Sequence, residues 1–123
     1  MILVNTSVWV DHLRSGDARL IDLLERGLVV MHPFVVGELA CGSLADRASI
    51  LELLQDLPTA IVAEGDEVSG LIERHCLYGK GVGCVDVHLL ASTLLTRGAA
   101  LWTRDQRLGA AADALGCAHR ETN

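Results

Sequence analysis

Four oxygen-bearing side chains stand where apolar runs end or where helical patterns begin. They are Asn5, Glu38, Asp86 and Asp105. The binding site of an open parallel sheet lies beyond the carboxyl ends of its strands, so residues that follow strand-like runs are expected to share one cleft. Carboxylates that meet in a cleft repel one another, and a divalent cation removes that repulsion. Oxygen ligands without His or Cys favour a hard ion, and the sequence therefore predicts a site for Mg²⁺ or Mn²⁺.

Each of these positions also has a purely structural interpretation. Asp105 could be the N-cap of the helical segment that follows it, and Asp86 could be a favourable acid in a first helical turn. Asn5 is a residue type common in turns. Glu38 is harder to explain in this way, because a glutamate with apolar neighbours is rarely buried without a partner. The metal-site hypothesis therefore depends on the four positions taken together.

Short apolar runs alternate with segments of helical periodicity along the chain. The predicted strands are residues 2–4, 28–31, 60–62 and 99–102, with a weaker run at 117–119. Helical periodicity occurs at residues 20–24, 50–54, 68–76, 90–94 and 108–115. Glycines at positions 27, 98 and 116 follow helical segments, as glycine often does at the end of a helix. This alternation predicts an α/β fold with a central parallel sheet flanked by helices.

Length and composition suit one domain over residues 1–123, because half of the residues are apolar. The formal net charge of -6 is unusual for a protein that binds nucleic acid through phosphate contacts. That objection weakens if several of the acids surround a cation, because the ion neutralises them. Aromatic residues make up only 3% of the chain, which argues against recognition of single strands by aromatic platforms.

The four cysteines show neither a CxxC pair nor a histidine partner at zinc spacing, so we expect them to be reduced and mostly buried. They are Cys41, Cys76, Cys84 and Cys117. The sequence shows no signal-peptide pattern and no apolar run long enough to span a membrane, and the expected location is the cytoplasm.

Other polar residues have weaker signals. His88 is expected to make a surface or supporting contact, and Ser7 is expected to cap a helix, because no nucleophile-elbow motif surrounds it. Three arginines are candidate phosphate contacts, with ordinary solvated arginine as the equal alternative. These arginines are Arg14, Arg104 and Arg107.

Four segments of the chain resemble the PIN-domain family and, within it, the VapC-type toxins. They are MILVNTSVW at 1–9, VGEL at 36–39, VDVHLLA at 85–91 and LWTRD at 101–105. The resemblance covers essentially the whole chain in order and spacing. It implies a three-layer α/β/α fold, Mg²⁺-dependent (or Mn²⁺-dependent) cleavage of RNA, homodimers, and inhibition by a VapB-type antitoxin.

Transferred by position, the four acidic residues of the family fall on Asn5, Glu38, Asp86 and Asp105. Thr103 resembles the hydroxyl residue that braces the site, and Thr6 is expected to support it from beside Asn5. Position 5 departs from the family, because an amide keeps the shape and one carbonyl ligand of aspartate but loses its charge. Weak or absent nuclease activity is therefore expected of this chain.

Two other classes of protein share some of these features. A receiver-like signalling domain also places acids at parallel strand ends, but a resemblance to that class would require a lysine after the last strand. The only lysine here is Lys80, in the glycine-rich segment 78–83. The second alternative is a non-catalytic protein that binds an antitoxin and DNA without cleaving RNA. A nuclease assay with and without Mn²⁺ separates that alternative from a weak enzyme.

Overall fold

The computed structural model describes residues 1–121. Within this range, three parallel strands form one sheet in the order β2-β1-β3. The strands are β1 (Ile2–Val4), β2 (Val29–Val30) and β3 (Ala100–Trp102). Ile2 of the central strand pairs with Val29 on one side and with Ala100 on the other. All three strands are largely buried, which explains why they are continuous apolar runs in the sequence.

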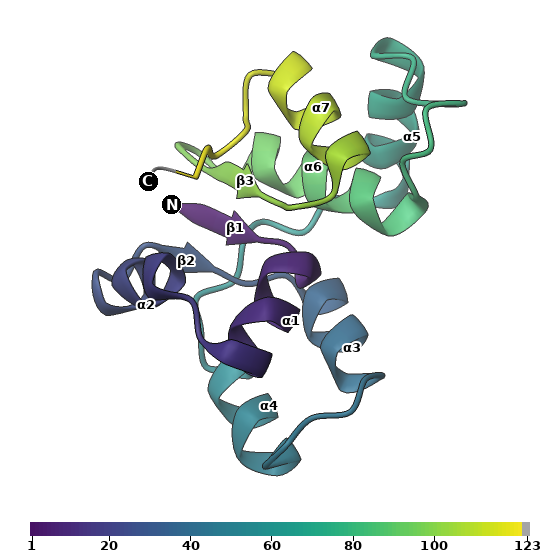
Figure 1. Cartoon of the computed structure of the whole chain (residues 1–123). Helices are drawn as coiled ribbons and strands as arrows, with labels where there is room; N and C mark the ends of the chain where they lie inside the picture. The colour runs from purple at the N-terminus through teal and green to yellow at the C-terminus, as the bar shows by residue number, and fades with distance from the viewer. Residues whose placement is uncertain (122–123) are drawn as a thin grey trace.

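Helices flank the sheet, as the sequence predicts (Figure 1). They are α1 (Thr6–Ser15), α2 (Ala18–Glu25), α3 (Pro33–Ala40), α4 (Arg47–Gln55), α5 (Gly65–Arg74), α6 (Cys84–Leu95) and α7 (Gln106–Ala114). The helices α1 to α4 lie around the half of the sheet that contains β2, whereas α5, α6 and α7 lie around the half that contains β3 (Figure 1). The loops after β1 and β3 therefore lie where the two groups of helices meet.

The predicted strand at residues 60–62 is wrong, because the chain there makes only an isolated parallel bridge between Met31 and Thr59. Ala60 still donates a backbone hydrogen bond to Met31, at 2.9 Å. The next amide, that of Ile61, donates instead to the hydroxyl of Thr96, so the ladder stops. The weaker run at 117–119 likewise forms a single bridge, between Leu101 and Ala118.

Glycine at the ends of the helices behaves as expected, since Gly27 and Gly98 adopt φ values of 67° and 74° after α2 and α6. The expectation for the cysteines is wrong in part. Cys117 is buried, but the other three cysteines are exposed. They lie at or beyond the ends of helices rather than in the strands that build the core.

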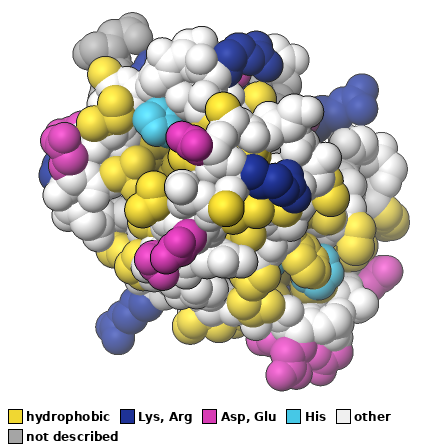
Figure 2. Space-filling model, turned by 90° about the horizontal axis from the view of Figure 1, so that it is seen from below, with side chains coloured by type: hydrophobic (Ala, Val, Ile, Leu, Met, Phe, Trp, Pro, Cys, Tyr) yellow, Lys and Arg dark blue, Asp and Glu magenta, His cyan; other side chains and the backbone are white. Residues whose placement is uncertain are grey.

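Figure 2 shows Lys and Arg side chains scattered over one face of the molecule rather than gathered into a basic band. Asp and Glu side chains lie on the same face, some of them next to basic groups, and apolar surface is exposed between many of the charged groups. Among the helices of residues 1–121, none has the length and apolar character needed to cross a membrane.

Candidate active site

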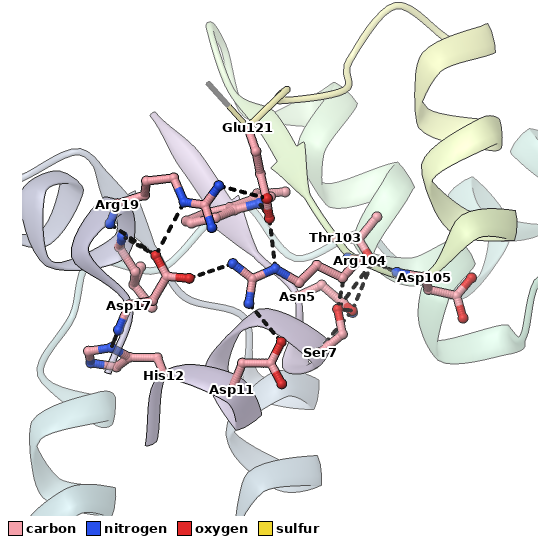
Figure 3. A network of polar contacts seen from close by, with 12 residues as sticks. Asn5, Ser7, Asp11, His12, Asp17, Arg19, Thr103, Arg104, Asp105 and Glu121 are labelled. Atoms are coloured by element: carbon pink, nitrogen blue, oxygen red, sulfur yellow. Dashed lines mark hydrogen bonds and ion pairs between the residues drawn. The ribbon is translucent and has the colours of Figure 1, made fainter. Parts of the chain in front are cut away.

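Asn5 joins the end of β1 to the start of α1 and caps that helix. Its side chain is only 5% exposed. The carbonyl oxygen Oδ1 accepts hydrogen bonds from the backbone N–H of Ser7 (3.2 Å), from Ser7 Oγ (2.8 Å) and from Thr103 Oγ1 (3.0 Å) (Figure 3). The cap of α1 is therefore Asn5, and the sequence-based assignment of Ser7 as the cap is wrong.

Ser7 and Thr103 together fix the side chain of residue 5 between β1 and β3. The hydroxyl of Ser7 accepts a hydrogen bond from the backbone N–H of Arg104, at 3.0 Å. Thr103 Oγ1 accepts one from the backbone N–H of Asp105, at 3.1 Å. Thr103 thus connects two of the predicted site positions, Asn5 and Asp105.

Glu38 lies on α3 and points to the start of α1. Its Oε1 accepts a hydrogen bond from Thr6 Oγ1 at 2.7 Å, so Thr6 supports the carboxylate directly. Glu38 is exposed, in contrast to the burial that its apolar neighbours in the sequence suggest. It needs no buried partner, and its exposure leaves the carboxylate accessible from solvent.

Asp86 lies in the first turn of α6, immediately after the loop that ends at Gly83. Burial raises the pKa of this carboxyl, and the negative charges of Asp105 and Glu38 raise it further. A hydrogen bond with the backbone of Gly83 opposes the rise in the pKa. Asp86 on α6 therefore lies within electrostatic range of two acids from other elements, Asp105 and Glu38.

Asp105 has the capping role considered from the sequence and also lies near a second acid. It caps α7, because its Oδ1 accepts a hydrogen bond from the backbone N–H of Leu108 at 2.9 Å. It also lies beside Asp86 closely enough to raise the pKa of that residue. In Figure 3 the Asp105 carboxylate lies on the opposite side of Thr103 from the guanidinium of Arg104.

A network around Arg104 anchors the connection between β3 and α7 and was not anticipated from the sequence. The guanidinium pairs with Asp11 (2.7 Å), Asp17 (2.5 Å) and Glu121 (2.7 Å), and it lies over the ring of Trp102 (Figure 3). With three carboxylates around it, Arg104 serves to hold α1, α2 and the C-terminal segment against the site. It is not the phosphate contact considered from the sequence.

The hydrogen bond from Arg104 lowers the pKa of Asp17 to about 2, although burial opposes the change. Asp17 also caps α2, because its Oδ1 accepts hydrogen bonds from the backbone N–H groups of Arg19 and Leu20. An aspartate just before a helical segment is a capping signal, so this half of its role was readable in the sequence. The ion pair with Arg104, 87 positions away in the sequence, could not be predicted in this way.

The donor set suits a hard divalent ion that keeps most of its water. Glu38, Asp86 and Asp105 offer only carboxylate oxygens, and a cation would relieve the repulsion that Asp86 experiences from the other two. As they are placed among residues 1–121, no group of three or more His, Cys, Asp or Glu side chains could hold a metal ion. Mg²⁺ usually binds through one or two carboxylates plus waters and phosphate oxygens, so an open set of this kind is compatible with it.

A short parallel sheet with acids beyond the ends of its strands is the arrangement of a PIN domain, and the PIN-domain family model matches residues 2–114. The chain belongs to this family. Over 121 residues it is 50% identical to Ribonuclease VapC32 of Mycobacterium tuberculosis, in strains CDC 1551 / Oshkosh and ATCC 25618 / H37Rv. The aligned region covers 98% of this chain and 98% of each relative.

Proposed function

We propose that this chain is the toxin component of a type II toxin–antitoxin system. It is an endoribonuclease that depends on Mg²⁺ or Mn²⁺, and Asn5 leaves its activity weak or absent. The observation that carries the proposal is the placement of Glu38 and Asp105 beside the start of α1 and the end of β3, through Thr6 and Thr103, with Asp86 within electrostatic range of both acids. The 50% identity to a ribonuclease supports the choice of RNA as substrate.

The residues of the cleft have distinct parts in this proposal. Glu38, Asp86 and Asp105 would hold the ion, and Thr6 and Thr103 would orient their neighbours in the site. The bound cation supplies positive charge that polarises the scissile phosphate and favours attack by water. Because water rather than the neighbouring 2′-hydroxyl attacks, the products carry a 5′-phosphate and a 3′-hydroxyl.

Asn5 explains the expected loss of activity. Its Oδ1 already accepts hydrogen bonds from two residues, Ser7 and Thr103. An aspartate in the same position would keep those hydrogen bonds on one oxygen and offer a second, charged oxygen to the ion. In asparagine the second group is an NH₂, which has no lone pair to give to a cation. Position 5 therefore contributes neither charge nor a free ligand.

A groove between α1, α3 and α4 is the proposed binding place of a VapB-type antitoxin. Its volume is about 520 Å³, and its apolar lining includes Val10, Leu13, Leu39 and Ile50. Glu38 also lines this groove, so a segment bound there ends beside the acidic cleft. An arginine of that segment would pair with the carboxylates without needing a metal.

We also propose that the protein forms homodimers. Apolar side chains such as Leu53, 64% exposed on α4, and Leu94, 43% exposed on α6, support homodimer formation through helix faces. We place the protein in the cytoplasm, where its RNA substrates are found.

A second candidate function is that of a non-catalytic antitoxin-binding protein. The engaged carbonyl of Asn5 favours this alternative for the chain as it stands, because a site without its fourth carboxylate holds a cation poorly. The two functions predict different results for the Asn5→Asp protein: the nuclease would cleave RNA, and the non-catalytic protein would not.

The experiment is to incubate the Asn5→Asp protein with total bacterial RNA and to map the new 5′ ends. We expect cleavage that requires Mg²⁺ or Mn²⁺, stops with EDTA and leaves 5′-phosphates. Asp86→Asn in the same background is the control and should be inactive. Cleavage that survives EDTA, or no cleavage by the restored protein, would refute the proposal.

A further inference from the structure

Two basic side chains share a pocket between α7 and the loop that leads into α6. The pocket has a volume of about 310 Å³. His75, Lys80 and Arg107 line it together with apolar side chains that include Leu77 and Val82. This is a local concentration of positive charge in a chain whose formal net charge is -6.

The loop is shaped to pack against Arg107. Gly81 has a φ of +74°, which side chains rarely adopt, and a Cβ there would lie only 2.7 Å from Arg107 Cδ and 2.9 Å from Cζ. Glycine at this position thus lets the backbone of the loop lie directly on the guanidinium group and its stem. The arrangement holds Arg107 beside the pocket.

Lys80 and Arg107 are free to bind an anion. Four other arginines, Arg19, Arg26, Arg104 and Arg120, pair with carboxylates. Across residues 1–121, by contrast, neither Lys80 nor Arg107 forms an ion pair. Both residues are exposed.

The pocket adjoins the acidic cleft through the same loop. A Cβ at Gly83 would lie 3.9 Å from Asp86 Oδ2, so the loop touches Arg107 at one glycine and Asp86 at another. Two residues of extended chain span at most about 7 Å. Arg107 also follows Asp105 by two positions. The cations therefore border the site at which cleavage is proposed.

We propose that Lys80 and Arg107 bind a backbone phosphate of the RNA strand next to the phosphate that is cleaved, an inference that rests on the proposed function. Arginine presents a planar fork to phosphate oxygens, and lysine adds a compact positive charge. Tyr78, 61% exposed in the same loop, offers a ring on which a base can stack. This ring would be an exception to the expectation, based on the low aromatic content, that aromatic side chains do not take part in RNA binding.

The experiment measures the binding of a fluorescein-labelled oligouridylate by anisotropy at several salt concentrations. It uses the chain with Asn5, so that binding is observed without cleavage. Arg107→Gln and Lys80→Gln should each weaken binding about fivefold at low salt, the upper end for an exposed ion pair. Each should also lower the slope of log affinity against log salt by about 0.7, the value for one phosphate contact on a single strand.

Arg97→Gln is the matched control, because Arg97 is also exposed and lies beyond the opposite end of α6 from Asp86. It should change neither the affinity nor the slope. Loss of affinity without a change in slope, equal effects of all three variants, or no binding by the parent would overturn the inference. So would unchanged RNA binding with an altered oligomeric state, which would make this surface a protein interface.

The inference and the proposed function fail separately. If the Asn5→Asp protein does not cleave RNA but binding still depends on Arg107, the nuclease proposal is refuted and the phosphate site stands. If that protein cleaves RNA while Arg107→Gln changes neither binding nor its slope, the phosphate site is refuted and the nuclease proposal stands.

Discussion

Residue 5 combines a structural part and a chemical part in one side chain. The capping oxygen that starts α1 is the same atom that Thr103 holds from β3. An amide and a carboxylate can both accept these hydrogen bonds, so the exchange of one for the other preserves the fold. The two side chains differ in their second terminal group, which is NH₂ in asparagine and an oxygen in aspartate. We expect the substitution to affect cleavage through this group alone.

The hydroxyl of Thr103 can be tested at this scale. Thr103→Val removes the hydrogen bond to Asn5 Oδ1, and the free energy of unfolding should fall by about 1 kcal/mol. In the Asn5→Asp background the same change should slow RNA cleavage about 10–100-fold, the usual effect of losing a group that orients a ligand. Urea unfolding and a cleavage assay measure both, and Thr103→Ser should retain both properties. Full activity of the valine variant would show that the hydroxyl does not orient residue 5.

The ion pair between Asp17 and Arg104 should make stability depend on pH. Because the pKa of Asp17 is lowered from 3.8 to about 2, its contribution is complete at neutral pH and is lost as the pH falls from about 4 to about 2. Asp17→Asn keeps a capping oxygen but removes the charge. It should lower the free energy of unfolding by about 1 kcal/mol at neutral pH, below the full linkage value because solvent screens the pair. Urea unfolding of both proteins over this range should show the difference vanish in acid, and a difference independent of pH would contradict the assignment.

At the scale of elements, α3 carries Glu38 but contains a glycine in its interior. A Cβ at Gly37 would meet nothing within 4 Å, so Gly37→Ala should stabilise the protein by about 0.5–1 kcal/mol. Gly27 also has open space around it, but its φ of +67° is left-handed. Gly27→Ala should therefore destabilise by about 1 kcal/mol or more. Thermal unfolding of the pair tests both expectations, and shifts of the same sign would contradict the explanation.

Local patterns explain which elements could be predicted. The apolar runs that become β1 and β3 are largely buried, and the glycines after α2 and α6 stop those helices. Residues 60–62 have the same composition as a strand, but the side chain of Thr96 takes the amide that would continue the ladder. A contact from α6 of this kind leaves no signal in the sequence around residue 60.

For the candidate site, too, local patterns could be predicted from the sequence and contacts between distant residues could not. Asn5, Asp86 and Asp105 each follow an apolar run or open a helix, which is why local patterns draw attention to them, whereas Glu38 lies in the last turns of α3. The support given by Ser7 and Arg104 could not be predicted, since their hydrogen bond joins residues 97 positions apart. Neither could the pocket of Lys80 and Arg107, which depends on how the loop folds onto α7.

At the scale of the whole molecule, the apolar groove between α1, α3 and α4 can be tested as the antitoxin surface. Val10 lines it and is 39% exposed, so Val10→Glu should abolish capture by a co-expressed VapB-type antitoxin without unfolding the protein. Ile21→Glu on α2 is the control, because Ile21 is 42% exposed and does not line the groove. Co-purification reports the result. Retention of the antitoxin by the Val10 variant would place its binding elsewhere.

The cleavage rates of the chain with Asn5 and of its Asn5→Asp variant, measured side by side on the same RNA with Mn²⁺ or Mg²⁺, test the central claim most directly. The restored protein should cleave at least 10–100-fold faster, because even an indirect partner of a metal ligand is worth that much. Its metal-free form should unfold at a slightly lower temperature, since a fourth charge joins a repelling cluster. Equal rates for the two proteins would show that residue 5 is not a ligand and would contradict the proposed site.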